Sequence, residues 1–147
     1  QGLHGKAEIE AFRQLPTFPE PEAARLCHLL LMKGLPAVAE DDLDAFGSVI
    51  TELQQSVGDH FAPAQGGRFT SSDVQSAIEL LASHGAVGLG QSSWGPTGFC
   101  MVATPGMADT LLNTVRSEFS HCPDLEFLIG TPRNQGALIT GQGAAHH

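Results

Sequence analysis

The stretch His84–Thr104 reads H-G-A-V-G-L-G-Q-S-S-W-G-P-T-G-F-C-M-V-A-T and holds five glycines and the only tryptophan of the chain. Glycine is unfavourable inside regular elements, so this density indicates unusual backbone conformations or close contact with another group. A helical pattern precedes the stretch, and its last part, Phe99–Ala103, is an apolar run typical of a strand. Residues 91–94 place polar donors and one ring at the tip. We interpret the stretch as a loop that faces a substrate.

Three known glycine motifs do not fit this loop. A dinucleotide fingerprint fails because Ser93 stands at the third glycine position of G-x-G-x-x-G and a strand follows instead of a helix. A phosphate-binding loop of the G-K-[ST] type needs a lysine that is lacking here. The nucleophile motif G-x-S-x-G fails at both Ser92 and Ser93. Two interpretations stay open: an anion-binding cradle of backbone N–H groups, and a tight turn around a core tryptophan.

The length indicates one domain, and the chain is acidic. The chain has 147 residues and a formal net charge of −9 with only seven Lys and Arg, which argues against nucleic-acid and polybasic membrane partners. No apolar run is long enough to span a membrane. Three scattered cysteines predict neither disulfides nor a zinc site and suit the cytoplasm. We expect a single domain over residues 1–141, a disordered tail over 142–147, and no metal ligands.

Periodicity predicts helices through the first half of the chain. A short helix is expected over Lys6–Leu15, and a central one over Pro21–Lys33, which Gly34 and Pro36 would interrupt or kink. The clearest amphipathic helix begins at an acidic cluster near Leu43 and is expected to end at Gly58. The spacing of Thr70 and Asp73 resembles a capping box for a helix that continues to about Ser83.

The second half predicts strands around one more helix. Thr97–Thr104 reads as a strand, and Thr104 with Pro105 suits the start of a helix that stops before Pro123. Short strands are expected over Leu125–Ile129 and Ala137–Thr140. The order of the elements predicts an α+β fold, with helices on one face of an antiparallel sheet and a ferredoxin-like split β-α-β arrangement.

Other candidate residues carry weaker signals. Gln65-Gly66-Gly67-Arg68 is read as a plain loop that gains interest only if it folds against the first glycine loop. Arg133 lies in a turn, where a surface position is the default and a fork for phosphate or carboxylate is the alternative. His28, in an apolar helix, is interpreted as a core or interface residue, and Cys100 as a small buried one.

Several of these motifs together resemble a known family. The glycine loop G-Q-S-S-W-G-P-T, the strand after it and the helix P-G-M-A-D-T-L-L are similar to the third motif of the GHMP small-molecule kinase superfamily. The segments G-L-H-G, A-R-L-C-H-L-L-L-M-K-G-L-P-A-V, A-P-A-Q-G-G and T-P-R-N-Q-G-A extend the likeness over residues 2 to 140. The closer match is the C-terminal half of the β-ribofuranosylaminobenzene 5′-phosphate synthase family.

The resemblance implies an enzyme of tetrahydromethanopterin biosynthesis. Such enzymes join 4-aminobenzoate or 4-hydroxybenzoate to phosphoribosyl pyrophosphate, with loss of CO₂ and pyrophosphate. Mg²⁺ would be expected with the pyrophosphate in the full enzyme, with none held by this chain alone. The chain is too short for the whole enzyme, so it would lack the N-terminal domain, as a fragment or as half of a split protein, and be inactive in isolation.

The resemblance also implies where the substrates would bind, although no catalytic acid or base can be named. Gln91, Ser92 and Ser93 replace glycines of the kinase motif, which fits a changed ligand better than ATP. A superfamily kinase for a small alcohol and a non-enzymatic dimerisation or binding module, which could form a homodimer, remain alternatives. The expected substrate-binding residues are Gly88, Gly90, Gln91, Ser92, Ser93, Trp94, Gly95, Pro96, Gln65, Gly66, Gly67 and Arg133.

Overall fold

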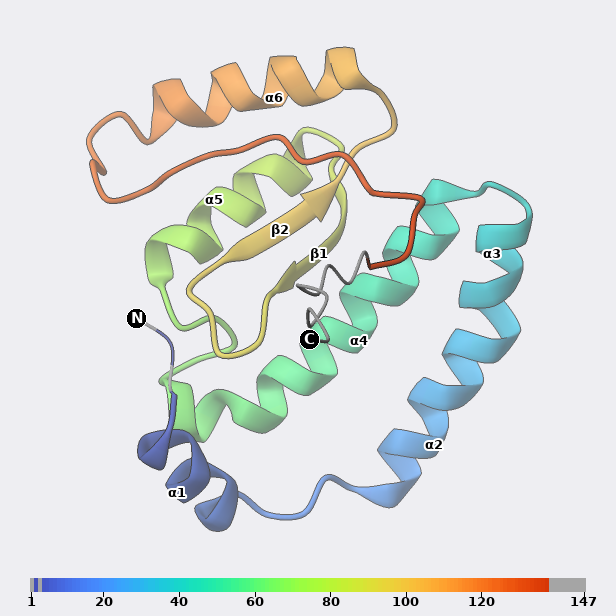
Figure 1. Ribbon diagram of the computed structural model, residues 1–147, viewed down its shortest axis with the longest axis vertical. Helices are drawn as coiled ribbons and strands as arrows, with labels where there is room; N and C mark the ends of the chain where they lie inside the picture. Colours follow the sequence, from blue (N-terminus) through green and yellow to red (C-terminus); the bar gives the residue numbers. More distant parts are fainter. Residues whose placement is uncertain (1, 3, 138–147) are drawn as a thin grey trace, which may run out of the picture.

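The longest helix, α4 (Leu43–Gln65), runs through the middle of the molecule, and the other elements are arranged around it (Figure 1). The computed structural model describes residue 2 and residues 4–137. In chain order the elements are α1 (Lys6–Gln14), α2 (Glu20–Leu29), η1 (Leu30–Gly34), α3 (Leu35–Ala39), α4, α5 (Ser72–Ser83), β1 (Val87–Gln91), β2 (Gly98–Met101) and α6 (Pro105–Glu118).

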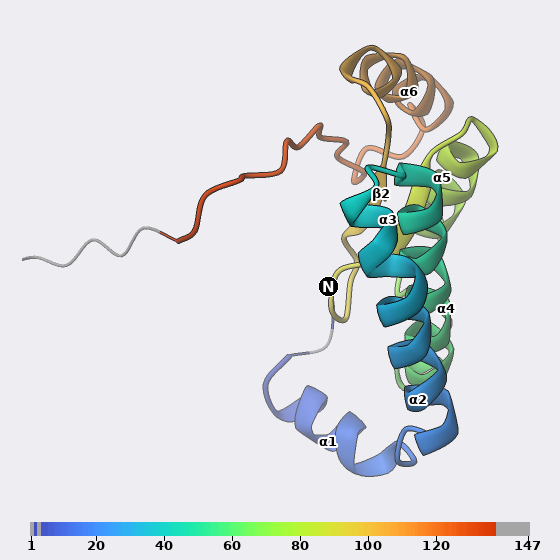
Figure 2. The same ribbon diagram turned by 90° about the vertical axis from the view of Figure 1, so that its right-hand side faces the viewer.

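The predicted central helix is part of a longer helical rod. The rod begins at Glu20 and ends at Ala39, and η1 within it is a π-helical turn, so Gly34 and Pro36 do not interrupt it as expected. Gly34 is buried because the rod packs there on α4, close to Val49. Figures 1 and 2 show the rod beside α4, with the two running in opposite directions.

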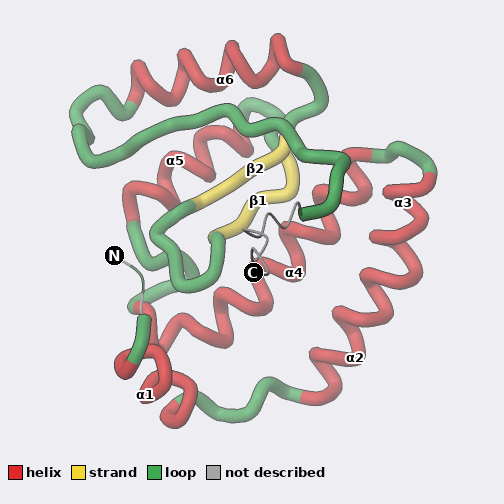
Figure 3. The backbone as a smooth tube through the Cα atoms, viewed as in Figure 1, coloured by secondary structure: helices red, strands yellow, loops and turns green. Residues whose placement is uncertain are grey.

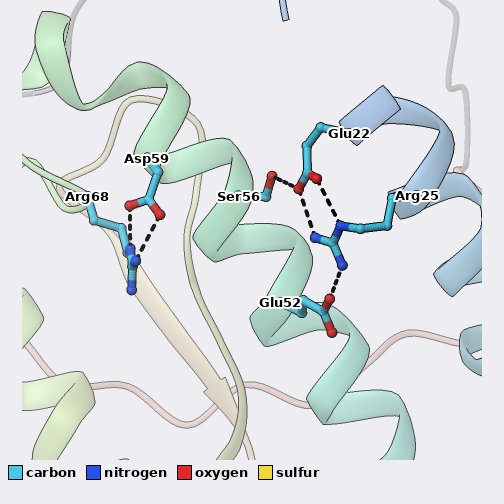
Figure 4. Close-up of polar contacts among 6 residues, drawn as sticks. All are labelled: Glu22, Arg25, Glu52, Ser56, Asp59 and Arg68. Atoms are coloured by element: carbon cyan, nitrogen blue, oxygen red, sulfur yellow. Dashed lines mark hydrogen bonds and ion pairs between the residues drawn. The ribbon is translucent and has the colours of Figure 1, made fainter. Parts of the chain in front are cut away.

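Charged side chains join the rod to α4 on its solvent side (Figure 4). The Arg25 guanidinium donates to both Glu22 carboxylate oxygens at 2.8 Å and also bonds Glu52 of α4, while the Ser56 hydroxyl donates to Glu22 at 2.5 Å. The Arg25 hydrogen bonds, and next that of Ser56, lower the pKa of Glu22 from 4.5 to about 2.

The predicted end of α4 at Gly58 is wrong. The helix continues through Pro63 to Gln65, and Gly66 ends it with a left-handed φ of 88°. Gly58 is buried because the Arg68 side chain crosses the helix there; a Cβ on Gly58 would lie 2.7 Å from Arg68 Cγ. This glycine therefore marks a close contact and not a helix end.

The two strands form an antiparallel sheet, with Val87 opposite Met101 and Gln91 opposite Gly98, and an irregularity between Val87 and Gly90. Both α4 and α5 lie behind the sheet in Figure 1, on the same face, as Figure 2 also shows. An isolated two-stranded ribbon is marginal in water, so this helical backing stabilises it. The predicted α+β class, with helices on one face of an antiparallel sheet, is confirmed.

Two helix starts test the capping predictions. Thr104 caps α6, accepting from Met107 N at 3.2 Å, as predicted. The cap of α5 is Ser71, which accepts from Val74 N at 3.3 Å, whereas the Thr70 hydroxyl donates to the Trp94 carbonyl. The capping box at Thr70 is therefore wrong, because a longer-range partner takes its hydroxyl.

The expected strand over Leu125–Ile129 is also wrong. This segment is a loop in Figure 3, and its carbonyl at Phe127 accepts from the Arg116 guanidinium of α6 instead of pairing in the sheet. Of the expected split β-α-β arrangement, the described residues therefore contain a strand and the helix α6, with no strand after α6. The expected strand Ala137–Thr140 reaches beyond them, and the expected tail 142–147 lies wholly outside.

The core lies where α4, α5, α6 and the sheet meet, and it includes Val49, Ile78, Leu111 and Val115. One face of the rod stays exposed and apolar, at Leu31, Met32, Leu35 and Val38. Within the described residues, each helix is either too short or too polar to cross a bilayer.

Candidate functional site

The connection between β1 and β2, residues 92–97, forms a tight tip. Ser92 N donates to Thr97 O at 2.8 Å and Gly95 N to Ser92 O at 2.9 Å. Ser93 and Gly95 both have positive φ, at 52° and 68°. Positive φ is rare for a non-glycine residue, so Ser93 marks a defined turn. Ser92 and Ser93 are both exposed to solvent.

Gln91, the last residue of β1, anchors this tip from inside. Its side chain is buried, at 8% exposure, and every polar group of the amide is bonded. Oε1 accepts from Thr70 N at 2.8 Å, and Nε2 donates to Gln65 Oε1 at 3.3 Å and Ser93 O at 3.2 Å. The backbone N–H of Gln91 donates to Gln54 Oε1 at 3.1 Å. One residue thus ties the tip to both ends of the α4–α5 connection and to α4 itself.

Trp94, by contrast, turns inward from the tip and is 7% exposed. Its indole Nε1 donates to Glu8 Oε1 of α1 at 3.0 Å. The rings of Phe12 and Phe61 meet it edge to face, with centroids at 5.5 Å and 4.8 Å. The single tryptophan is therefore the centre of an aromatic cluster between α1 and the end of α4.

The structure brings most of the expected site residues together. Gln65, at the end of α4, contacts Gln91, so the second glycine segment folds against the first, with Gly66 and Gly67 next to it. Arg133 is separate, because residues 130–137 extend away from the body in Figure 2. The expected residues at or next to the tip are Gly90, Gln91, Ser92, Ser93, Trp94, Gly95, Pro96, Gln65, Gly66 and Gly67, whereas Gly88 lies at the far end of β1, against Met101. Their contact with a substrate stays a prediction.

The contacts of the glycine loop bear on its two interpretations, an anion-binding cradle of backbone N–H groups and a tight turn around a core tryptophan. Gly88 and Gly90 lie within β1 and are buried; a Cβ on Gly90 would lie 2.5 Å from Gln54 Cγ, so this glycine permits close helix–strand packing. The N–H groups of Gln91, Ser92 and Gly95 all donate to acceptors of the chain. The turn around a core tryptophan is present, and the hydroxyl-bearing residues Ser92, Ser93 and Thr97 are exposed on it.

Behind the tip lies a cavity of about 340 Å³ between α1, α4, α5 and β1. Its walls combine the aromatic cluster with the side chains of Ile78 and Leu89 and with several glutamines. Sequence reasoning missed the parts of this wall that come from Glu8, Phe12, Phe61 and Gln54. A helical pattern places such residues on a face, but it carries no signal that two helices distant in sequence share one cavity.

Charge on the cavity wall is acidic on balance. Among the described residues, Glu8 and Glu79 are the acidic members of the wall and Arg68 is its one Lys or Arg. Arg68 is already paired with Asp59, through Nε at 2.8 Å and a terminal nitrogen at 2.9 Å (Figure 4). The hydrogen bond between them raises the pKa of Arg68 and lowers that of Asp59. No unpaired cation is left in the wall, as far as the described residues form it.

The remaining candidate residues lie elsewhere. His28 is exposed on α2, so its interpretation as a core residue is wrong. Cys100 is half-buried in β2, and burial raises the pKa of its thiol. Over residue 2 and residues 4–137, no three His, Cys, Asp or Glu side chains gather in a way that could hold a metal ion.

Comparison with known proteins agrees with this arrangement. The model of the family described as GHMP kinases C terminal matches residues 35–121, from α3 to just past α6. β-Ribofuranosylphenol 5′-phosphate synthase of Methanocaldococcus jannaschii is 38% identical over 98 residues, which are 65% of this chain and 27% of that protein. The synthase of the same name from Archaeoglobus fulgidus is 29% identical over 142 residues, 95% of this chain and 41% of that protein.

A third synthase of this name, from Methanothermobacter thermautotrophicus, is 32% identical over 96 residues and is covered to 28% of its length. The chain therefore spans less than half the length of these curated relatives. No solved structure matches it. Because the family model covers more than half of the chain, including the tip and the helices that hold it, the chain belongs to the GHMP kinase C-terminal family.

Proposed function

We propose that this chain is the C-terminal part of a synthase that joins a para-substituted benzoate to phosphoribosyl pyrophosphate. The observation that carries the proposal is the shared name of three relatives, each a β-ribofuranosylphenol 5′-phosphate synthase. A phenol in the product favours 4-hydroxybenzoate over 4-aminobenzoate as the aromatic substrate. The pathway that would use such a product is tetrahydromethanopterin biosynthesis.

The proposed reaction balances without a further reagent. The ring carbon that bears the carboxylate attacks the anomeric carbon of the ribose, and the bond from the anomeric carbon to pyrophosphate breaks. The electrons of the ring–carboxylate bond then restore the aromatic ring as CO₂ leaves. The ribose passes through a state with oxocarbenium character, so the enzyme must hold the pyrophosphate and orient the ring carbon.

The exposed hydroxyls of Ser92 and Ser93 are the groups of this chain best placed to contact a phosphate or pyrophosphate. A hydroxyl donates a neutral hydrogen bond, and the tip that carries these two is fixed by Gln91 and so is preorganised. The described residues contain no carboxylate set that fits Mg²⁺, so any metal would arrive with the pyrophosphate or bind another part of the protein. We expect the isolated chain to be inactive.

The test uses the full-length protein and 4-hydroxybenzoate labelled in its carboxyl group. Release of labelled CO₂ should require phosphoribosyl pyrophosphate, and Ser92→Ala with Ser93→Ala should lower kcat/KM by about tenfold, which is about 1.4 kcal/mol. The matched control is Ser76→Ala with Ser117→Ala, two exposed serines on α5 and α6. No labelled CO₂ from the wild type would refute the reaction, and an unchanged rate in the Ser92/Ser93 variant would remove the tip from the site.

A second candidate is a kinase that phosphorylates a small alcohol, and the family description itself favours it. Under this alternative, the full-length protein would transfer phosphate from ATP, and phosphoribosyl pyrophosphate would have no effect. Running both assays on one preparation separates the two functions.

A further inference from the structure

The cavity behind the tip has the size and surface of a small-molecule site. Its volume of about 340 Å³ falls within the range of known ligand pockets, and about 150 Å³ is enough to hold benzene in another protein. Phe12, Phe61 and Trp94 line one part of it, and Ile78 and Leu89 line another. These walls are planar or apolar and suit a flat ring.

The polar groups on the wall are mostly uncharged. Gln54, Gln55 and Gln75 line the cavity together with the hydroxyl of Thr51. Some of their capacity is used within the fold: Gln54 Oε1 accepts from Gln91 N, and Thr51 Oγ1 accepts from Leu89 N at 3.0 Å. The Thr51 hydroxyl can still donate, and a side-chain amide can both donate and accept. Such groups match a hydroxyl or amine on a ring.

The charged groups on the wall oppose an anion. Glu8 and Glu79 belong to the cavity wall, and the Arg68 guanidinium is bonded through two nitrogens to Asp59. A phosphate, a pyrophosphate or a carboxylate placed inside would meet like charges with no unpaired cation of the described residues beside it. Like charges repel, and neither carboxylate has a free cation beside it in the described wall, so the cavity disfavours anionic groups.

We infer that this cavity binds the uncharged, phenolic end of the aromatic substrate and leaves its carboxylate and the phosphoribosyl group outside. The inference rests on the proposed function for the identity of the ring. In a para-substituted benzoate the hydroxyl and the carboxylate lie at opposite ends of the ring. If the hydroxyl enters the acidic, amide-lined cavity, the carbon that reacts lies at the mouth.

The position of the tip supports an orientation of the ring with its hydroxyl inside the cavity. Ser93 belongs both to the cavity wall and to the exposed tip, so a ring seated in the cavity with its hydroxyl inward would have its outer end near Ser93. The hydroxyls of Ser92 and Ser93 are the groups proposed to hold phosphate. The two substrates would then meet at the residue that the cavity and the tip share.

The test uses the indole N–H signal of Trp94, the single tryptophan, in an NMR titration of the 147-residue chain. Phenol is the probe and inorganic pyrophosphate the counter-probe. Phenol should shift the Trp94 signal saturably and show nuclear Overhauser contacts between its ring protons and the Leu89 methyls. Pyrophosphate should not displace phenol, because it is proposed to bind at the serine hydroxyls outside the cavity. No saturable shift with phenol, no contact to Leu89, or displacement of phenol by pyrophosphate would each overturn the inference.

A variant that fills the cavity provides a second test of phenol binding. Val57 lines the cavity, so Val57→Phe should weaken phenol binding by about tenfold or more, because the larger ring takes the space. The control is Val38→Phe, the same substitution at an exposed site on α3, which should bind phenol as the wild type does. Wild-type affinity in Val57→Phe would place the site elsewhere; if that variant does not fold, the contacts to Leu89 in the wild type decide.

Kinetics of the full-length protein separate this inference from the proposed reaction. Phenol binding by the chain needs neither phosphoribosyl pyrophosphate nor turnover, so it can succeed when the reaction assay fails. If the reaction is confirmed, Val57→Phe should raise KM for 4-hydroxybenzoate and leave KM for phosphoribosyl pyrophosphate unchanged. A rise in the second KM alone would contradict the assignment of the cavity to the ring.

Discussion

At the scale of single residues, the contrast between Gln91 and its serine neighbours matters most. A buried amide with all its polar groups bonded stabilises the local structure, while exposed hydroxyls one and two positions later are available to a ligand. Sequence reasoning placed all three in one set of substrate contacts. Since burial of a polar residue depends on what packs around it, the chain alone could not distinguish the anchor from the exposed pair.

Replacing Gln91 should measure its contribution to the free energy of unfolding. Gln91→Glu keeps the shape but puts a carboxylate where Nε2 donates to Gln65 Oε1 and Ser93 O. We expect a loss of about 2 kcal/mol in the free energy of unfolding near neutral pH, because two acceptors lose their donor and a buried charge is created. The folded state would raise the pKa of this glutamate, so the loss should grow as pH rises above about 4.3.

Urea unfolding at a series of pH values measures this loss. Gln55→Glu is the matched control, since Gln55 is an exposed glutamine on α4. Equal unfolding midpoints for the two variants at neutral pH would show that the hydrogen bonds of Gln91 contribute nothing to stability.

At the scale of elements, the packing of α4 on β1 depends on small residues at the contact. Gly47 of α4 is buried, and a Cβ there would lie 2.6 Å from two atoms of the Val87 side chain. Gly47→Ala should therefore destabilise the fold by about 1–3 kcal/mol, the usual range for overpacking. Gly106→Ala, in the first turn of α6 with open space around it, should instead stabilise by about 0.4–1 kcal/mol. Thermal unfolding of both variants compares them, and a stabilising Gly47→Ala would contradict this account of the interface.

The ion-pair network between α2 and α4 predicts a defined pH dependence. Because the folded state lowers the pKa of Glu22 from 4.5 to about 2, its contribution to stability is complete above pH about 4.5. The contribution is lost as pH falls through about 2. The difference in urea midpoint between wild type and Glu22→Gln should thus shrink across that window. Glu20→Gln, an exposed change on the same helix, should show no such window, and a constant difference for Glu22→Gln would rule out the network as its source.

At the scale of the whole molecule, stability should be unevenly distributed. The packing of α4 on β1 is the most extensive in the fold, whereas α1 has no buried residue and meets the body chiefly through Glu8 and Phe12. Native-state hydrogen exchange should therefore be slowest in the middle of α4 and in β1 and fastest in α1. Protection of α1 equal to that of α4 would show that α1 unfolds only with the whole domain.

Much of the fold could be predicted from the chain. The apolar spacing after Leu43 indicates the long helix, and Thr104 with Pro105 indicates the start of α6, because these signals are local. The predictions at Gly58 and Thr70 failed because partners distant in sequence, Arg68 and Trp94, determine what those residues do. For the candidate site, the glycine loop predicts the tip, but the cavity depends on α1 meeting α4, which no periodic pattern reports.

The π-helical turn η1 has a consequence for the history of the chain. A wider turn accommodates one more residue than an α-helix would over the same length, and each residue of an α-helix rotates the next by about 100°. Without the wider turn, an added residue between Leu30 and Gly34 would rotate α3 by that angle and take Ala37 from its buried place. A relative with one residue fewer here would have a regular helix with Ala37 still buried, so single-residue deletions in this turn should be tolerated among relatives of this sequence.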